Sequence, residues 1–127
     1  MSAPMGFQYA VLRCVPRVDR EEFVNVGVVL YCQRVDFLAA ACHVDRERLA
    51  ALAPGLDLDG VCSALATVEA VCRGAESAGA AGRTPLNTRF GFLSAPRSTV
   101  VQPGPIHGGL TTDPARELDH LLDRLVR

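Results

Sequence analysis

The sequence predicts an α+β fold with an antiparallel sheet of about four strands and three to four helices, mainly on one face. A three-stranded N-terminal meander is predicted over residues 6–42, where apolar side chains alternate in runs joined by short connections. Helices and one late strand are predicted in the rest, where apolar residues recur mostly at three- and four-residue intervals. The length of 127 residues fits a single domain, 1–127.

The strands of the meander follow one another closely. Residues 6–15 alternate and end at Pro16, which has no N–H for a ladder hydrogen bond. Residues 23–32 are apolar on both faces. This pattern predicts a central strand covered by helices on both sides, or by helices on one side and a partner on the other. A polar turn at residues 33–34 leads into the third strand, residues 35–42.

Helices are predicted at four places. Carboxylates that can accept hydrogen bonds from the first helical turn precede three of them: Asp45, Asp57 and Asp113. The helix after Asp57 should run to about Arg73, because its apolar residues form one stripe. Residues 85–93 also carry apolar side chains at helical spacing and predict a further short helix.

The other late segments are predicted to be mostly irregular. Small residues fill the segment 74–84, which should be a flexible loop. Residues 98–102 are rich in β-branched side chains and predict the fourth strand. The prolines of residues 103–105 should end that strand, and residues 106–110 should form a glycine-containing loop.

Composition argues against several classes of protein. The net charge is −1 and all thirteen basic residues are arginine, so the chain lacks the positive field that favours nucleic-acid binding. No apolar run is long enough to span a bilayer, and residues 1–9 lack a signal-peptide pattern. We therefore expect a soluble cytoplasmic protein with no membrane association. The five cysteines show no metal-binding spacing, so we expect unpaired thiols, no metal and no cofactor.

Asn25 and Gly27 form the most conspicuous candidate site. A buried amide without partners is costly, and glycine lets another group approach the backbone closely. If the two residues share one face of the strand, they could form a ligand seat. Alternatively, Asn25 could hold a neighbouring loop while Gly27 accommodates a packed ring. Arg13, near the end of the first strand, could come close to Asn25 when the two strands pair.

Arg97 and His107 complete the candidate binding residues. Arg97 precedes a serine and a threonine, and such a group can hold a phosphate or carboxylate, although arginine is more often solvated or structural. His107 is predicted to lie in the loop before the last helix, where imidazole could act as acid, base or ligand. It could equally serve only the structure of that loop. No catalytic residue can be assigned.

Three segments carry a family resemblance: residues 9–13 (YAVLR), 22–30 (EFVNVGVVL) and 105–114 (PIHGGLTTDP). Together they resemble the bacterial domain of unknown function 3037 family, and the likeness spans nearly the whole chain. The resemblance implies no established activity. It implies a HipA-like kinase as partner, and only by association, because members are often encoded beside such a kinase.

We interpret the chain as a small bacterial accessory or binding protein that acts with a protein partner. An exposed apolar sheet face or edge would favour this interpretation. A small enzyme or binding protein for a phosphate- or carboxylate-bearing substrate is the alternative, and it would gather Arg13, Asn25, Arg97 and His107 in a closed polar pocket. A nucleic-acid-associated protein is a weaker alternative, which a contiguous arginine stripe would favour.

Overall fold

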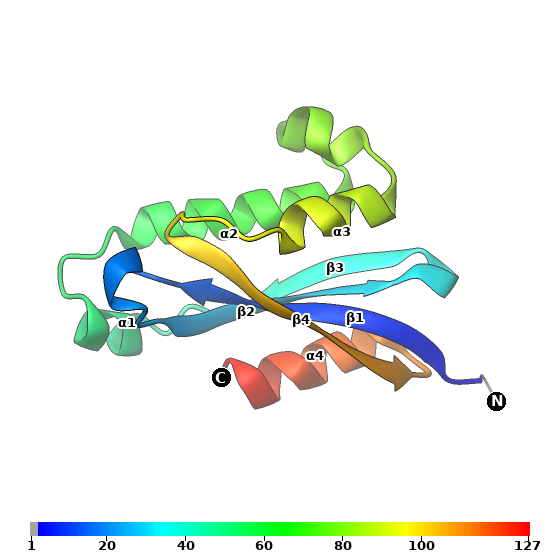
Figure 1. Ribbon diagram of the computed structural model, residues 1–127, viewed down its shortest axis with the longest axis horizontal. Coiled ribbons are helices and arrows are strands. Elements are labelled where there is room, and N and C mark those ends of the chain that lie inside the picture. The colour runs from blue at the N-terminus through cyan, green and yellow to red at the C-terminus, as the bar shows by residue number, and fades with distance from the viewer. Residues whose placement is uncertain (1–2) are drawn as a thin grey trace.

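The sheet is antiparallel, with the strand order β3-β2-β1-β4 (Figure 1). The computed structural model describes residues 3–127, and the sheet in this part of the chain has four strands. These are β1 (Met5–Cys14), β2 (Val24–Cys32), β3 (Phe37–Cys42) and β4 (Val101–Thr111). The predicted α+β fold, with an N-terminal meander and a late strand, is confirmed. The connection before β3 is a 3₁₀ turn, η2 (Gln33–Val35), so β3 begins later than predicted.

The α-helices lie where the sequence predicts them. They are α1 (Arg46–Leu52), α2 (Leu58–Arg73), α3 (Leu86–Ser94) and α4 (Pro114–Leu125). Of these, α1, α2 and α4 begin directly after their capping carboxylates. The side chains of Asp45, Asp57 and Asp113 each accept a hydrogen bond from a backbone N–H of the first turn of α1, α2 and α4, respectively. These bonds satisfy amide groups that have no partner within the helix. A further 3₁₀ turn, η1 (Val18–Arg20), lies in the connection from β1 to β2.

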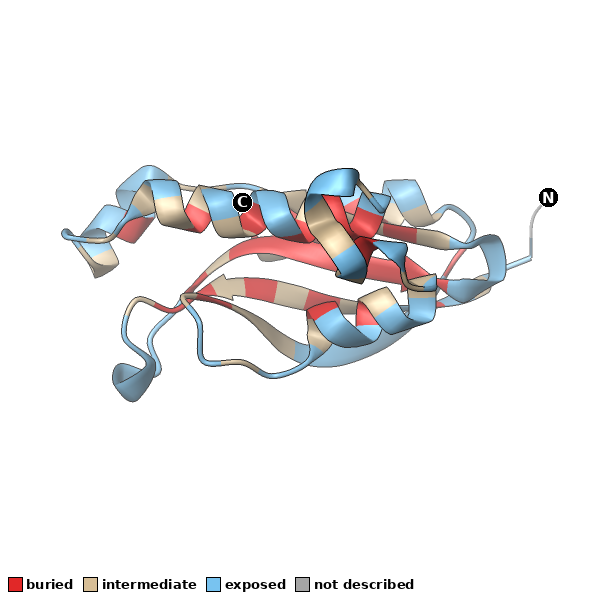
Figure 2. Ribbon diagram, turned by 90° about the horizontal axis from the view of Figure 1, so that it is seen from above, coloured by how far each residue is buried: buried red, intermediate tan, exposed pale blue. Residues whose placement is uncertain are grey.

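Helices cover both faces of the sheet and divide its apolar side chains between two cores (Figures 1 and 2). The α2/α3 core includes Leu12, Val26, Val29, Leu49, Val61, Val71 and Phe90. The α4 core includes Phe7, Val28, Leu30, Cys32, Leu118, Leu121, Leu122 and Val126. Along β2, only Asn25 is not buried, which confirms the predicted central strand. Because α4 packs mainly on β2 and β3, its side of the sheet is covered less completely over β1 and β4.

A β-bulge in β2 changes which residues share a face. Leu12 pairs with Gly27, whereas the next residue, Arg13, pairs with Asn25, so Val26 is an extra residue in β2. Val26 lies in the α2/α3 core, and Gly27 faces Leu12 of the same core. Asn25 instead reaches α4. The expectation that Asn25 and Gly27 share a face is therefore wrong, because strict alternation does not hold across a bulge.

β4 is much longer than the predicted fourth strand. It continues through residues 103–105 and includes residues 106–110, which were expected to form a loop. That expectation is wrong, because β4 lies at the edge of the sheet, where a proline need not donate to a neighbouring strand. A shift in register also accommodates the prolines: Leu12 pairs with Pro103 and Ala10 with Ile106, which leaves one extra residue in β4.

The small-residue segment 74–84 folds into short turns. It contains η3 (Glu76–Arg83), which packs on α2, and Gly82 in it is buried. Gly74 ends α2 with a positive φ of 67°, a conformation that glycine adopts without steric cost. The guanidinium of Arg89 donates to the carbonyl of Thr84, so α3 is tied to the end of the segment. The flexibility of this segment stays a prediction.

Candidate functional site

Arg13 and Asn25 are brought together as the sequence predicts. They are direct partners across β1 and β2. The Nδ2 of Asn25 donates to the backbone carbonyl of Leu125, at the end of α4, over 3.0 Å. Asn25 thus holds the end of a neighbouring helix, where the alternative to a ligand seat expected a neighbouring loop.

Gly27 lies apart from this pair, on the opposite face. A Cβ at Gly27 would lie 3.0 Å from the carbonyl oxygen of Ala41, 3.1 Å from Sγ of Cys42 and 3.3 Å from Cδ1 of Leu12. These distances leave no room for a ligand. The glycine lets β2 pack closely against its neighbours.

Arg97 and His107 do not join Arg13 and Asn25. Arg97 lies in the connection from α3 to β4, where its guanidinium donates to the carbonyls of Phe92 and Ala95 and stacks over the Phe92 ring. His107 lies on β4 opposite Tyr9, with the ring centroids 5.3 Å apart. The structure therefore does not gather the four residues into the closed polar pocket that the substrate-binding alternative requires.

The C-terminal half of β4 exposes its side chains on both faces of the sheet. Every residue from Pro105 to Leu110 is exposed. Successive residues of a strand face opposite sides, so neither side of this half-strand is covered by a helix. Because β4 is an edge strand, its backbone groups on the side away from β1 also lack a neighbouring strand within residues 3–127.

We call residues 106–111 the β4 edge segment. Ile106 and Leu110 lie on the same face of it and are 48% and 72% exposed, respectively. No charged residue occurs between Val101 and Thr111, and both prolines of β4 precede Ile106. Natural edge strands are usually protected by charges, prolines or bulges. The β4 edge segment has none of these protections, so it is suited to pairing with another strand.

The opposite edge of the sheet differs. None of the residues of β3 is exposed, and both α2 and α4 pack on this strand. The sheet thus has one covered edge, at β3, and one open edge, at β4. The sequence prediction missed Ile106 and Leu110 because it placed them in a loop. The signal that could have identified them is the uncharged run of residues 101–111.

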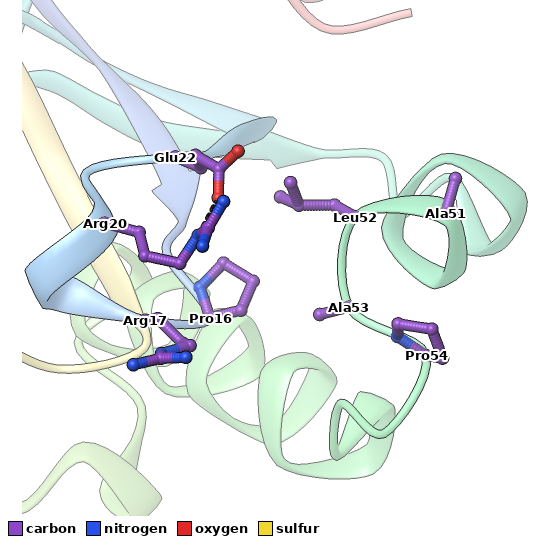
Figure 3. Close-up of a pocket in the computed structure, with 8 residues that line it drawn as sticks. All are labelled: Pro16, Arg17, Arg20, Glu22, Ala51, Leu52, Ala53 and Pro54. Carbon is purple, nitrogen blue, oxygen red and sulfur yellow. Dashed lines mark hydrogen bonds and ion pairs between the residues drawn. The ribbon is translucent and has the colours of Figure 1, made fainter.

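A separate hollow lies between the connection from β1 to β2 and the end of α1 (Figure 3). Its volume is about 460 Å³, and it is lined by Pro16, Arg17, Arg20, Glu22, Ala51, Leu52, Ala53 and Pro54. Its two cations already have partners, since Arg20 pairs with Glu22 and Arg17 with Asp19. The hydrogen bond from Arg20 lowers the pKa of Glu22. The hollow therefore offers no unpaired charge to a ligand.

Burial makes three of the five cysteine thiols weakly reactive. All five are free thiols. Burial raises the pKa of Cys42 and of Cys72 to about 12 and also raises that of Cys14. These three side chains are thus protonated and weakly nucleophilic at neutral pH. Within residues 3–127, no group of three His, Cys, Asp or Glu side chains is placed to hold a metal ion.

The family model for "Protein of unknown function (DUF3037)" matches residues 9–126 of the chain. Neither a curated protein nor a solved structure matches the chain.

Among residues 3–127, no helix combines the length and the apolar character that crossing a membrane requires. The geometry of the β4 edge segment is therefore the main guide to function.

Proposed function

The chain belongs to the DUF3037 family, and we propose that it is a non-catalytic binding module that recruits a protein partner to its β4 edge. The observation that carries this proposal is the open, uncharged β4 edge segment, with Ile106 and Leu110 exposed on one face. An exposed apolar edge is the feature that distinguishes a partner-binding module from the substrate-binding alternative.

The partner should supply an extended segment that adds a fifth strand beside β4. In this mode of recognition, main-chain hydrogen bonds give affinity, and alternate side chains give specificity. Gly108 lies between Ile106 and Leu110, two residues from each, and has no side chain. Apolar side chains of the partner can therefore lie along this face. Because the β4 edge segment carries no charge, the matching segment should be largely uncharged too.

A HipA-like kinase is the first partner to look for, because the family resemblance implies it. The proposal itself concerns the mode of binding and does not depend on that identity. A different protein with an uncharged extended segment would fit the β4 edge equally well.

The test is quantitative recovery of partners from a lysate of the native host. The edge variant Ile106→Lys/Leu110→Lys adds the charges that protect natural edge strands. Its control, Val35→Lys/Phe92→Lys, adds the same charge at two side chains that are each 50% exposed and lie outside β4. Circular dichroism first establishes that both variants melt close to the wild type.

We expect at least one protein to be recovered with the wild type and the control, and at least about tenfold less with the edge variant. Equal recovery with all three proteins would contradict the proposal, as would the absence of any specific partner. Light scattering then measures the oligomeric state of the wild type and of both variants. A dimer that the edge variant alone disrupts would assign the edge to a second copy and overturn the proposal of a separate partner.

A further inference from the structure

Three buried polar atoms without a hydrogen-bond partner lie next to one another in the sheet. Within residues 3–127 they are Nε of Arg13, Oδ1 of Asn25 and Nε2 of Gln102. Arg13 pairs with Asn25 on one side and with Gln102 on the other, so the three side chains form one row across β2, β1 and β4. Buried polar atoms are nearly always hydrogen-bonded. Three such atoms in one row are therefore unusual and need an explanation.

The guanidinium of Arg13 is held in place without a counter-ion. Its Cζ lies 4.2 Å from the centroid of the Phe23 ring, a cation–π contact. It also lies against the bare backbone of Gly104, where a Cβ would be only 3.0 Å from Cζ. The ion pairs within residues 3–127 do not involve Arg13. A cation without a counter-ion beside a cavity is available to an anionic group.

This guanidinium borders a cavity that is distinct from the hollow near α1. The cavity has a volume of about 340 Å³, and its lining residues are Arg13, Val15, Val18, Glu21, Phe23 and Gln102. Two of the three unpartnered atoms, Nε of Arg13 and Nε2 of Gln102, are donors on residues of this lining. Asn25 does not line the cavity, so its oxygen lies outside the site.

We propose that Arg13 and Gln102 bind a carboxylate in this cavity. Arginine presents paired N–H groups that match the two oxygens of a carboxylate, and the Gln102 amide adds a further donor. Glu21 also lines the cavity, and its negative charge opposes any anion there, a doubly charged phosphate more strongly than a singly charged carboxylate. Neither unpartnered nitrogen contacts solvent in the unliganded protein, so the proposal requires both side chains to turn toward the cavity on binding.

The carboxylate can come from a free small molecule or from the C-terminus of a protein chain. The test follows the backbone amide signals of the lining residues Val15 and Phe23 by NMR, and in the wild type also the Arg13 Nε–Hε signal, during separate titrations with acetate, inorganic phosphate and sodium chloride. A pair of alanine tetrapeptides, one with a free C-terminus and one amidated, forms the second arm. None of these titrations needs a protein partner, so this inference and the proposed function can fail independently.

We expect a saturable shift with acetate or with the free-terminus peptide, and none with the amidated peptide. A response to acetate assigns the site to free carboxylates, and a response to the peptide alone assigns it to a chain terminus. Arg13→Met should weaken binding at least about tenfold, and Gln102→Leu about three- to tenfold. If Arg13→Met does not fold, the affinity of Gln102→Leu for the carboxylate alone decides whether the inference holds.

Arg97→Met is the matched control, because Arg97 also stacks on a phenylalanine but already donates to backbone carbonyls. It should leave the affinity unchanged. The inference would be overturned by saturation with phosphate instead of carboxylate, by no shift beyond that of sodium chloride, or by equal loss in the Arg97 control.

Discussion

Replacing Gly27 with alanine tests the close packing of the central strand. Gly27 is buried, and the added Cβ would lie 3.0 Å from the backbone oxygen of Ala41 and 3.1 Å from the sulfur of Cys42. Because the added Cβ would press against the backbone of β3, β2 and β3 must separate slightly. Overpacking of this kind costs about 1–3 kcal/mol, and alanine returns roughly 0.4–1 kcal/mol by restricting the unfolded chain. We expect a net loss of about 1–2 kcal/mol.

Urea denaturation followed by circular dichroism measures this loss, which corresponds to a fall in melting temperature of roughly 4–10 °C at this chain length. Gly91→Ala is the control, because Gly91 is exposed within α3 and a Cβ there meets no atom within 4 Å. It should stabilise the protein by about 0.5–1 kcal/mol. If Gly27→Ala were as stable as the wild type, the space beside Gly27 would be open and the packing argument would be refuted.

Three further predictions concern caps, amides and thiols. Asp57→Ala removes the cap of α2 and should lower the free energy of unfolding in urea by about 1 kcal/mol; no loss would mean that the cap is dispensable. Asn25→Ala removes the hydrogen bond to Leu125 and should cost about 1 kcal/mol by the same assay, whereas unchanged stability would make that bond negligible. Folding raises the thiol pKa of Cys42 and Cys72 to about 12, so their contribution to stability is complete below the pKa of an unfolded thiol. It should then decline as the pH rises toward 12, and a urea midpoint that stays constant from pH 8 to 11 would contradict this.

The sequence was most informative where local chemistry decides the structure. Asp57 and Asp113 identified the beginnings of α2 and α4 because a capping carboxylate needs only its own first turn. The apolar run around Val28 identified the central strand because both of its faces are buried.

Features that depend on the neighbouring strands could not be read from local patterns. The bulge at Val26 places Asn25 and Gly27 on opposite faces, and it is visible only in the pairing of β2 with β1. Pro103 is compatible with a strand only because β4 lies at an edge, which depends on the order of the whole sheet. Gln102 was not a candidate residue, because its place beside Arg13 follows from the same pairing.

Amide hydrogen exchange shows whether a protein partner pairs with the β4 edge. The wild-type protein is compared alone and in complex with the partner recovered from the lysate. In the free protein, the amide groups of residues 106–111 that point away from β1 should exchange rapidly, because no strand covers them. In the complex, we expect strong protection of these amides, with little change in α2 and α3. Protection elsewhere, with residues 106–111 exchanging as fast as in the free protein, would contradict it.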